Sequence, residues 1–197
     1  MEKLEVRRWT RQEYDRMVEA GILGEDDHVE LIDGEIVKMA PQGKPHAAAI
    51  RRVHVALQRA FGPERYVQVQ LPMTPDDVSE PEPDLAVLPG SPWDFDEEHP
   101  ATALLVVEVA ESSLSFDRKR KGGLYARAGI PEYWIVNLKR GRLEVYRDPA
   151  PDASADLGWR YRTVRSLVPG DEIVPLGIDE PVAVSDLLPR SVRERTS

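Results

Sequence analysis

Two acidic residues stand inside apolar segments of the sequence. Asp84 lies in PEPDLAVL and Glu108 lies in ALLVVEVAE. The first segment has the Pro-bounded pattern of a β-strand, and the second is a β-branched run typical of a central strand. A carboxylate in such a strand is costly unless it is paired, hydrogen-bonded or bound to a metal. The lysine-rich segment FDRKRKGGLY follows, so the pattern predicts that these residues form one metal site.

A hard divalent cation would bind these residues through oxygen. Mg²⁺ needs one or two carboxylates and a backbone carbonyl, and it keeps several waters. Asp84, Glu108 and the carbonyl of Val109 meet this need, with Mn²⁺ as an alternative to Mg²⁺. The bound ion would lower the pKa of a water molecule and neutralise charge on a phosphoryl group.

Lys121 is the candidate that orients the attacking water and stabilises the developing negative charge. Asp117, Lys121 and Tyr125 are spaced four residues apart, so they are expected on one face of a helix. Lys119 points to another face and is the poorer candidate. Plainer interpretations remain open: Asp84 as a cap at a strand start, and Glu108 as half of a structural ion pair with Lys121 or an arginine.

Other reactive residue types give weaker patterns. His46 and His54 are eight residues apart, but without cysteines or a second histidine cluster they are poor zinc ligands. His46 could contact phosphate or the waters of a metal, although a role at a helix end is more usual. Ser112-Ser113 has no identifiable His–Asp partner, and Gly122-Gly123 matches no phosphate-binding fingerprint.

The flanking sequence predicts the elements that position these residues. Residues 9–23 predict a helix with a capping box between Thr10 and Glu13. HVELIDGEIVKMA predicts a β-hairpin that turns at Asp33-Gly34. An amphipathic helix is expected in HAAAIRRVHVALQRAF, and another from about Asp117 to Gly129. Strands are expected in RYVQVQLPM, DLAVL, LLVVEVA, EYWIVN and RLEVYRD.

This order of elements predicts an α/β (α+β) fold with a central mixed β-sheet flanked by helices. The helix between LLVVEVA and EYWIVN would make a right-handed crossover if those strands are parallel. We expect a single domain over residues 1–197, with a core at about 8–147. Short β segments and a last helical turn would form a C-terminal appendage at about 148–197.

Composition narrows the class of protein. Hydrophobic residues make up 41% and charged residues 31% of the chain, which is typical of a soluble globular protein. No apolar run is long enough for a membrane span, and the N-terminus lacks the apolar core of a secretory signal. With no cysteine, disulfides, thiolate zinc sites and a cysteine nucleophile are excluded. A cytoplasmic location is the default expectation.

The net charge is −9, from 26 basic and 35 acidic residues, whereas nonspecific DNA-binding proteins usually carry a basic face. The run Arg118-Lys119-Arg120-Lys121 directly follows the acidic strand, and local potential matters more than net charge where a cleft focuses the field. Such a run is nevertheless most often a solvated helix face.

The motif residues resemble the PD-(D/E)xK pattern of the restriction-endonuclease-like nuclease superfamily: Pro83-Asp84, then Glu108-Val109-Ala110. More closely, the chain resembles the Uma-type family of putative restriction endonucleases, formerly a domain of unknown function, over roughly residues 8–147. The matching segments are VELIDGEIVKMAP, the helix from His46, PEPDLAVL, LLVVEVAESS and DRKRKGGLYARAGIPEYWIVN.

This resemblance implies a restriction-endonuclease-like core and Mg²⁺-dependent phosphodiester hydrolysis of DNA. It implies that Asp84 and Glu108 bind metal and that Lys121 is the catalytic lysine. The third motif position is Ala110, so the lysine would come from the following helix. Glu30 matches an acid that the superfamily often supplies from an upstream element. A homodimer is an open option, because nucleases that cut both strands commonly pair through two-fold symmetry.

Two alternatives remain. A nuclease-fold protein without catalysis could act as a binding or assembly module, through segments such as GSPWDF and EYWIVN; Ala110 and the acidic net charge favour that alternative. A metal-dependent hydrolase of another phosphoester is the third candidate, and small nucleotides tested beside DNA would distinguish it.

Overall fold

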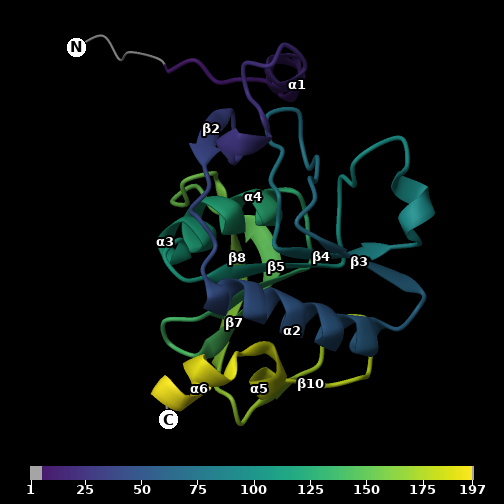
Figure 1. Ribbon diagram of the computed structural model, residues 1–197, viewed down its shortest axis with the longest axis vertical. Helices are drawn as coiled ribbons and strands as arrows, with labels where there is room; N and C mark the ends of the chain where they lie inside the picture. Colours follow the sequence, from purple (N-terminus) through teal and green to yellow (C-terminus); the bar gives the residue numbers. More distant parts are fainter. Residues whose placement is uncertain (1–5, 197) are drawn as a thin grey trace.

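The computed structural model describes residues 6–196. Its centre is a six-stranded sheet of order β3-β4-β5-β6-β7-β8, with helices on both faces (Figure 1). Strands β5 and β6 are parallel, and the other neighbours are antiparallel. The predicted mixed sheet is therefore confirmed. Its strands are β3 Arg65–Val69, β4 Leu85–Pro89, β5 Leu105–Ala110, β6 Glu132–Asn137, β7 Arg142–Pro151 and β8 Trp159–Leu167.

The two parallel strands are buried along their whole length. Their apolar, β-branched sequences suit a position in which both faces of the strand are covered. The connection between them is helical, because parallel neighbours need a crossover. This crossover consists of α3 Leu114–Phe116, the π-helical turn η3 Asp117–Lys121 and α4 Gly122–Arg127.

Each face of the sheet has its own hydrophobic core. On one face, α2 (Lys44–Phe61) packs residues such as Val53 and Leu57 against the sheet. The C-terminal elements extend this core: β9 Glu172–Ile173, β10 Val182–Ala183, α5 Val184–Leu187 and α6 Arg190–Thr196. On the other face, Leu124 and Tyr125 of α4 pack with Tyr133 and Tyr161 of the sheet.

The predicted β-hairpin is present as β1 Val29–Ile32 and β2 Glu35–Lys38, with its turn at Asp33-Gly34. It follows α1 (Arg11–Glu19), whose Thr10–Glu13 capping box is also as predicted. The Glu80 amide donates to the Leu31 carbonyl at 2.7 Å, which joins the hairpin to the loop before β4. Arg127 of α4 binds Asp33 at 2.7 Å and Asp76 at 2.8 Å. The hairpin is thus fixed above the sheet. The described residues also contain two short 3₁₀ turns, η1 Glu25–Asp27 and η2 Pro92–Phe95.

Several element boundaries differ from the prediction. Helix α2 begins at Lys44 rather than His46, because Pro45 is accepted in a first helical turn. The helical crossover begins at Leu114 rather than at about Asp117, and it contains a π turn that four-residue spacing does not reveal.

The C-terminal region also differs from the expected set of short β segments. Strand β7 continues to Pro151, and the nine-residue β8 is the edge strand of the central sheet. Most side chains of β8 are exposed, with Tyr161 and Leu167 the buried ones. An edge strand of this kind has weak hydrophobic alternation, which explains why the sequence did not reveal its length. Within residues 6–196, no helix is long and apolar enough to cross a membrane.

Candidate active site

Strands β4 and β5 bring the two predicted metal ligands together. Leu85 pairs with Val107 in this antiparallel ladder, so one further step places Asp84 opposite Glu108. Directly opposed side chains lie on the same face, with Cβ atoms about 4.5–5.5 Å apart. The two side chains are nearly buried, with 8% of Asp84 and 4% of Glu108 exposed.

Glu108 is bound from the helical crossover. Its Oε1 accepts a hydrogen bond from Lys121 Nζ at 2.9 Å and another from the Tyr125 hydroxyl at 2.8 Å. Lys121 and Tyr125 are one turn apart in the crossover, which lies over this face of the sheet. The predicted shared face of these two residues is therefore present, and it is directed at Glu108.

Lys121 also binds the hairpin. Its Nζ lies 2.9 Å from Oε1 of Glu30 in β1, and the same oxygen accepts the Glu82 backbone amide at 3.0 Å. The structure therefore brings Glu30, Glu108 and Lys121 into direct contact, although the lysine is 91 residues from Glu30. All three are buried.

The π turn η3 distinguishes the four residues of the basic run. Arg118 forms a two-point contact with Glu144, Arg120 pairs with Glu35, Lys119 is exposed and Lys121 is buried. A widened turn of this type is rare in helices and is frequent at functional sites. The run is therefore not a uniformly solvated face.

Close packing fixes the helix after this turn. A Cβ on Gly122 would lie 3.3 Å from the Asp117 carbonyl and 3.5 Å from the Tyr133 ring. The Tyr133 hydroxyl donates to that same Asp117 carbonyl at 3.1 Å. A side chain at position 122 would therefore crowd the Asp117 carbonyl, so Gly122 suits the π turn that presents Lys121 to Glu108.

The burial of this cluster shifts its pKa values. Burial raises the pKa of Glu108 well above its ordinary value, although the Lys121 charge opposes this. For Lys121, burial acts to lower the pKa, but the carboxylates of Glu108 and Glu30 outweigh it and the pKa is raised. Burial likewise raises the pKa of Asp117 to about 6. These shifts reflect the burial of several carboxyl groups close to one lysine.

Asp84 is held by three neighbours. Its Oδ2 accepts the Val109 backbone amide at 2.8 Å and lies 3.2 Å from Nε2 of His46, in the first turn of α2. Its Oδ1 receives only a long contact of 3.3 Å from the Gln70 side-chain amide. Gln70 has a left-handed backbone with φ of 49°, which is uncommon for a residue other than glycine.

Burial acts to lower the pKa of His46, but its hydrogen bond with Asp84 and the Asp84 charge outweigh this effect. The backbone of Val109 and the carboxylate of Glu111 act in the same direction, and the pKa is raised. His46 is therefore part of the acidic cluster rather than a simple helix-end residue. The sequence had indicated a possible contact with phosphate or metal waters, but not this contact with Asp84.

The donor set fits a hard cation that keeps much of its hydration shell. The Glu30 and Glu108 carboxylates contact the Lys121 ammonium, and the carboxylates of Asp84 and Asp117 lie near enough to Glu108 to act on its pKa. Within the described residues, no group of three or more His, Cys, Asp or Glu side chains is placed to hold a metal ion. Two carboxylates with a backbone carbonyl and water are a sufficient set for Mg²⁺ but not for zinc.

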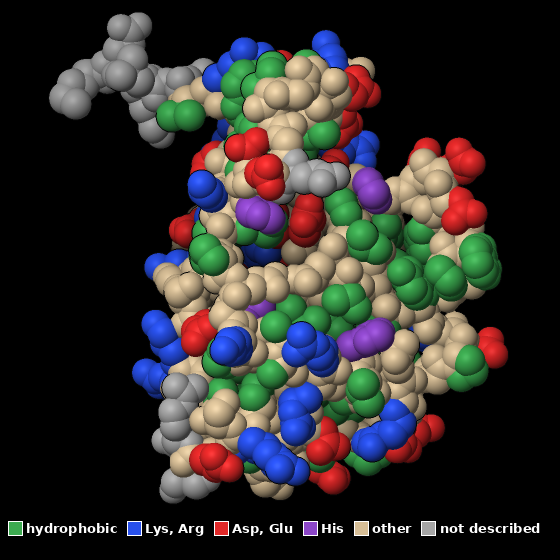
Figure 2. Space-filling view, viewed as in Figure 1, with side chains coloured by type: hydrophobic (Ala, Val, Ile, Leu, Met, Phe, Trp, Pro, Cys, Tyr) green, Lys and Arg blue, Asp and Glu red, His purple; other side chains and the backbone are tan. Residues whose placement is uncertain are grey.

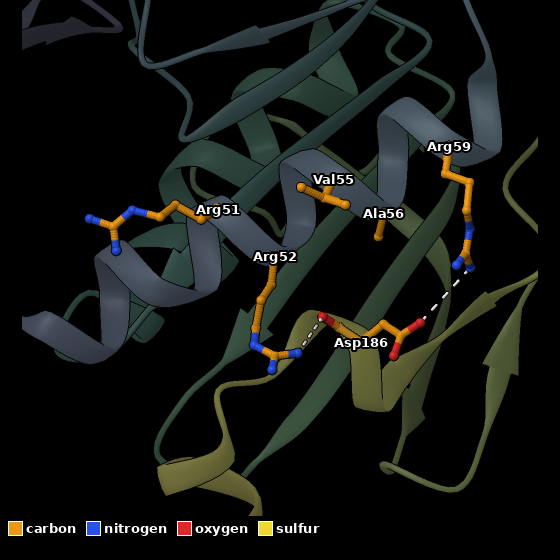
Figure 3. A pocket seen from close by; sticks show the side chains of 6 residues that line it. All are labelled: Arg51, Arg52, Val55, Ala56, Arg59 and Asp186. Carbon is orange, nitrogen blue, oxygen red and sulfur yellow. Dashed lines mark hydrogen bonds and ion pairs between the residues drawn. The ribbon is translucent and has the colours of Figure 1, made fainter.

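The surface of the molecule is hollowed between the hairpin and α2, and acidic side chains gather around this hollow (Figure 2). A separate depression of about 270 Å³ lies on the other side of α2. There, Arg52 donates to the Asp186 carbonyl at 3.3 Å and Arg59 lies 3.9 Å from the Asp186 carboxylate (Figure 3). Those contacts attach α5 to α2, and none of the acidic cluster lines this depression.

A solved structure has a similar fold. The chain resembles the crystal structure of a putative nuclease belonging to DUF820 from Anabaena variabilis ATCC 29413, with a TM-score of 0.63 and 19% sequence identity. The match covers 86% of this chain and 94% of that chain. At this identity the likeness shows the fold.

The family of this protein follows from its match to a protein-family model. The Uma2 family, described as "Putative restriction endonuclease", matches residues 11–182, and the chain belongs to it. The resemblance found from the motifs is thereby confirmed, and the match extends beyond residue 147 because β8 belongs to the sheet. A comparison with curated proteins finds no significant match.

Proposed function

We propose that this protein is a Mg²⁺-dependent endonuclease that hydrolyses phosphodiester bonds of DNA. The observation that carries this proposal is the buried Lys121 ammonium, 2.9 Å from both Glu30 and Glu108, beside the cross-strand carboxylate Asp84. A purely structural ion pair needs one acid for one base, and this cluster has an excess of acids. The family description supports the choice of DNA as substrate.

Each residue has a distinct proposed role. Asp84, Glu108 and the Val109 carbonyl would hold Mg²⁺, with Mn²⁺ as a substitute. When bound, the ion would lower the pKa of a water molecule and neutralise phosphoryl charge. Lys121 would orient the attacking water and stabilise the charge that develops on the phosphate. Glu30 would hold the lysine in position.

Tyr125 adds a role that the sequence did not predict. Its hydroxyl and the Lys121 ammonium both donate to Oε1 of Glu108, so Oε2 of this carboxylate is available for a cation. A cytoplasmic location is part of this proposal. We also propose a two-fold homodimer, because a dimer would place one site on each strand of a duplex.

Plasmid nicking tests the function. Purified protein should nick supercoiled DNA in Mg²⁺ or Mn²⁺ and not in EDTA. Asp84→Ala and Glu108→Ala should each abolish nicking, while the exposed-site control Glu98→Gln should not. Mg²⁺ should also raise the thermal unfolding temperature, and Glu108→Gln should remove that increase. If both alanine variants nick DNA at the wild-type rate, the proposed metal site is refuted.

A non-catalytic binding module is the second candidate. It is favoured by the absence, within the described residues, of three clustered metal-binding side chains, and by the net charge of −9. Under this alternative, neither cation would raise the unfolding temperature, and neither DNA nor small nucleotides would be cleaved. Cleavage of nucleotides without nicking of DNA would instead indicate a different phosphoesterase.

A further inference from the structure

The contact between His46 and Asp84 links α2 to the acidic cluster. The Nε2 atom of His46 lies 3.2 Å from Oδ2 of Asp84, and the histidine side chain is only 13% exposed. Helix α2 is fixed against the sheet by buried residues along its inner face, including Ala49 and Val53. The imidazole is therefore presented by a rigid element, not by a loop.

The two oxygens of Asp84 have different surroundings. Oδ2 receives two donors, His46 and the Val109 amide at 2.8 Å. Oδ1 receives only the Gln70 amide, at 3.3 Å. A carboxylate held by one oxygen in this way keeps its orientation, and the other oxygen, with only this long contact, could bind a cation. Groups that hold ligands in this manner strongly affect metal affinity.

The surroundings of the other ring nitrogen, Nδ1, indicate that packing alone does not explain why position 46 is a histidine. Nδ1 is buried and has no hydrogen-bond partner of normal geometry within residues 6–196, although the Val109 backbone lies close enough to His46 to act on its pKa. An unsatisfied buried nitrogen carries a desolvation cost, which an apolar side chain at the same position would avoid. The imidazole therefore has a use in its contact with Asp84.

We propose that His46 is a positioning residue of the metal site, which holds Oδ2 of Asp84 so that Oδ1 faces the cation. This inference rests on the proposed function, since it assumes that Asp84 binds metal. It assigns His46 no direct bond to the ion, in agreement with the absence of a three-side-chain site in the described part of the chain.

The test measures metal affinity in the absence of DNA. Isothermal titration of Mn²⁺ and Mg²⁺ into the full chain would compare the wild type with His46→Ala, His46→Gln and His46→Asn. The glutamine amide can reach the position of Nε2, whereas the shorter asparagine amide cannot. His54→Ala is the matched control on the same helix. Thermal unfolding in EDTA establishes that each variant is folded.

We expect His46→Ala and His46→Asn to weaken cation binding by about 10-fold, the lower end of the effect of outer-shell partners. His46→Gln should restore binding to near the wild-type level, and His54→Ala should not change it. Unchanged or tighter binding in both His46→Ala and His46→Asn would overturn the inference. If Asp84→Ala still abolishes binding in that case, the proposed function stands and only the role of His46 fails. A wild type that binds neither cation would overturn both.

Discussion

The ammonium of Lys121 lies 2.9 Å from Oε1 of Glu108, and both residues are almost completely buried. The lysine comes from a π turn and the glutamate from a central strand 13 residues earlier. In the more usual motif the lysine stands on the same strand as the glutamate, at the position of Ala110. In this protein Ala110 packs in the core, and under the proposed function Lys121 would take the role of that lysine from the helical crossover.

Removal of Lys121 should affect stability and activity together. Lys121→Ala leaves Glu30 and Glu108 buried without their cation, which should cost about 3 kcal/mol of unfolding free energy and abolish nicking. Urea unfolding and plasmid nicking measure the two effects. Lys119→Ala, two residues away and exposed, should change neither. Full nicking activity in Lys121→Ala would exclude the lysine from the chemistry.

Tyr125 should contribute to the site through its hydroxyl alone. Tyr125→Phe keeps the ring and removes the 2.8 Å hydrogen bond to Glu108. The expected loss is about 1 kcal/mol of unfolding free energy, the usual value of one buried hydrogen bond, together with weaker Mg²⁺ binding. Tyr161→Phe removes a hydrogen bond to the Ile130 carbonyl instead, so it is the matched control. It should lose similar stability without a change in Mg²⁺ affinity.

Arg127 should support the site from a distance, because it joins α4 to the hairpin that carries Glu30. Its two ion pairs, with Asp33 at 2.7 Å and Asp76 at 2.8 Å, are partly shielded from solvent. Arg127→Met should therefore lower the unfolding free energy by about 1–2 kcal/mol and reduce nicking without abolishing it. The change Arg165→Met, on the exposed side of β8, should have neither effect. Nicking at the wild-type rate would show that the hairpin stays in place without Arg127.

Glu80 predicts a pH dependence of stability that is separate from the site. Burial, with the nearby Asp15 and Glu82 charges, raises its pKa from 4.5 to about 7, while Arg11 opposes the shift. The folded state binds the Glu80 proton more tightly than the unfolded state does. The protonated side chain therefore contributes fully to the unfolding free energy below pH 4.5, and this contribution is lost as the pH rises through 7.

The Glu80→Gln variant removes this titration. Since the residue is only half-buried, solvent screening limits the effect to about 1 kcal/mol. We expect the variant to be more stable than the wild type by this amount at pH 8 and by much less at pH 4.5, measured by urea unfolding. The exposed Glu64→Gln is the control. A difference between variant and wild type that does not change with pH would contradict the assignment.

Local patterns in the sequence determined much of the architecture. Asp33-Gly34 between apolar runs fixed the hairpin, and Thr10 with Glu13 fixed the first helix start, because turns and caps depend on neighbouring residues. The apolar runs of β5 and β6 identified buried strands. Glu108 within such a run and Asp84 at the start of another indicated a site, since an unpaired buried carboxylate is costly.

Only the tertiary structure decided which partners these acids have. Strand pairing set Asp84 opposite Glu108, and the π turn directed Lys121 inward while Lys119 remained in solvent. His46 and Asp84 are 38 residues apart in the chain, and their contact depends on how α2 packs across the sheet. Sequence spacing cannot specify such contacts, because strand register, helix placement and burial are set by the packing of the whole domain rather than by neighbouring residues.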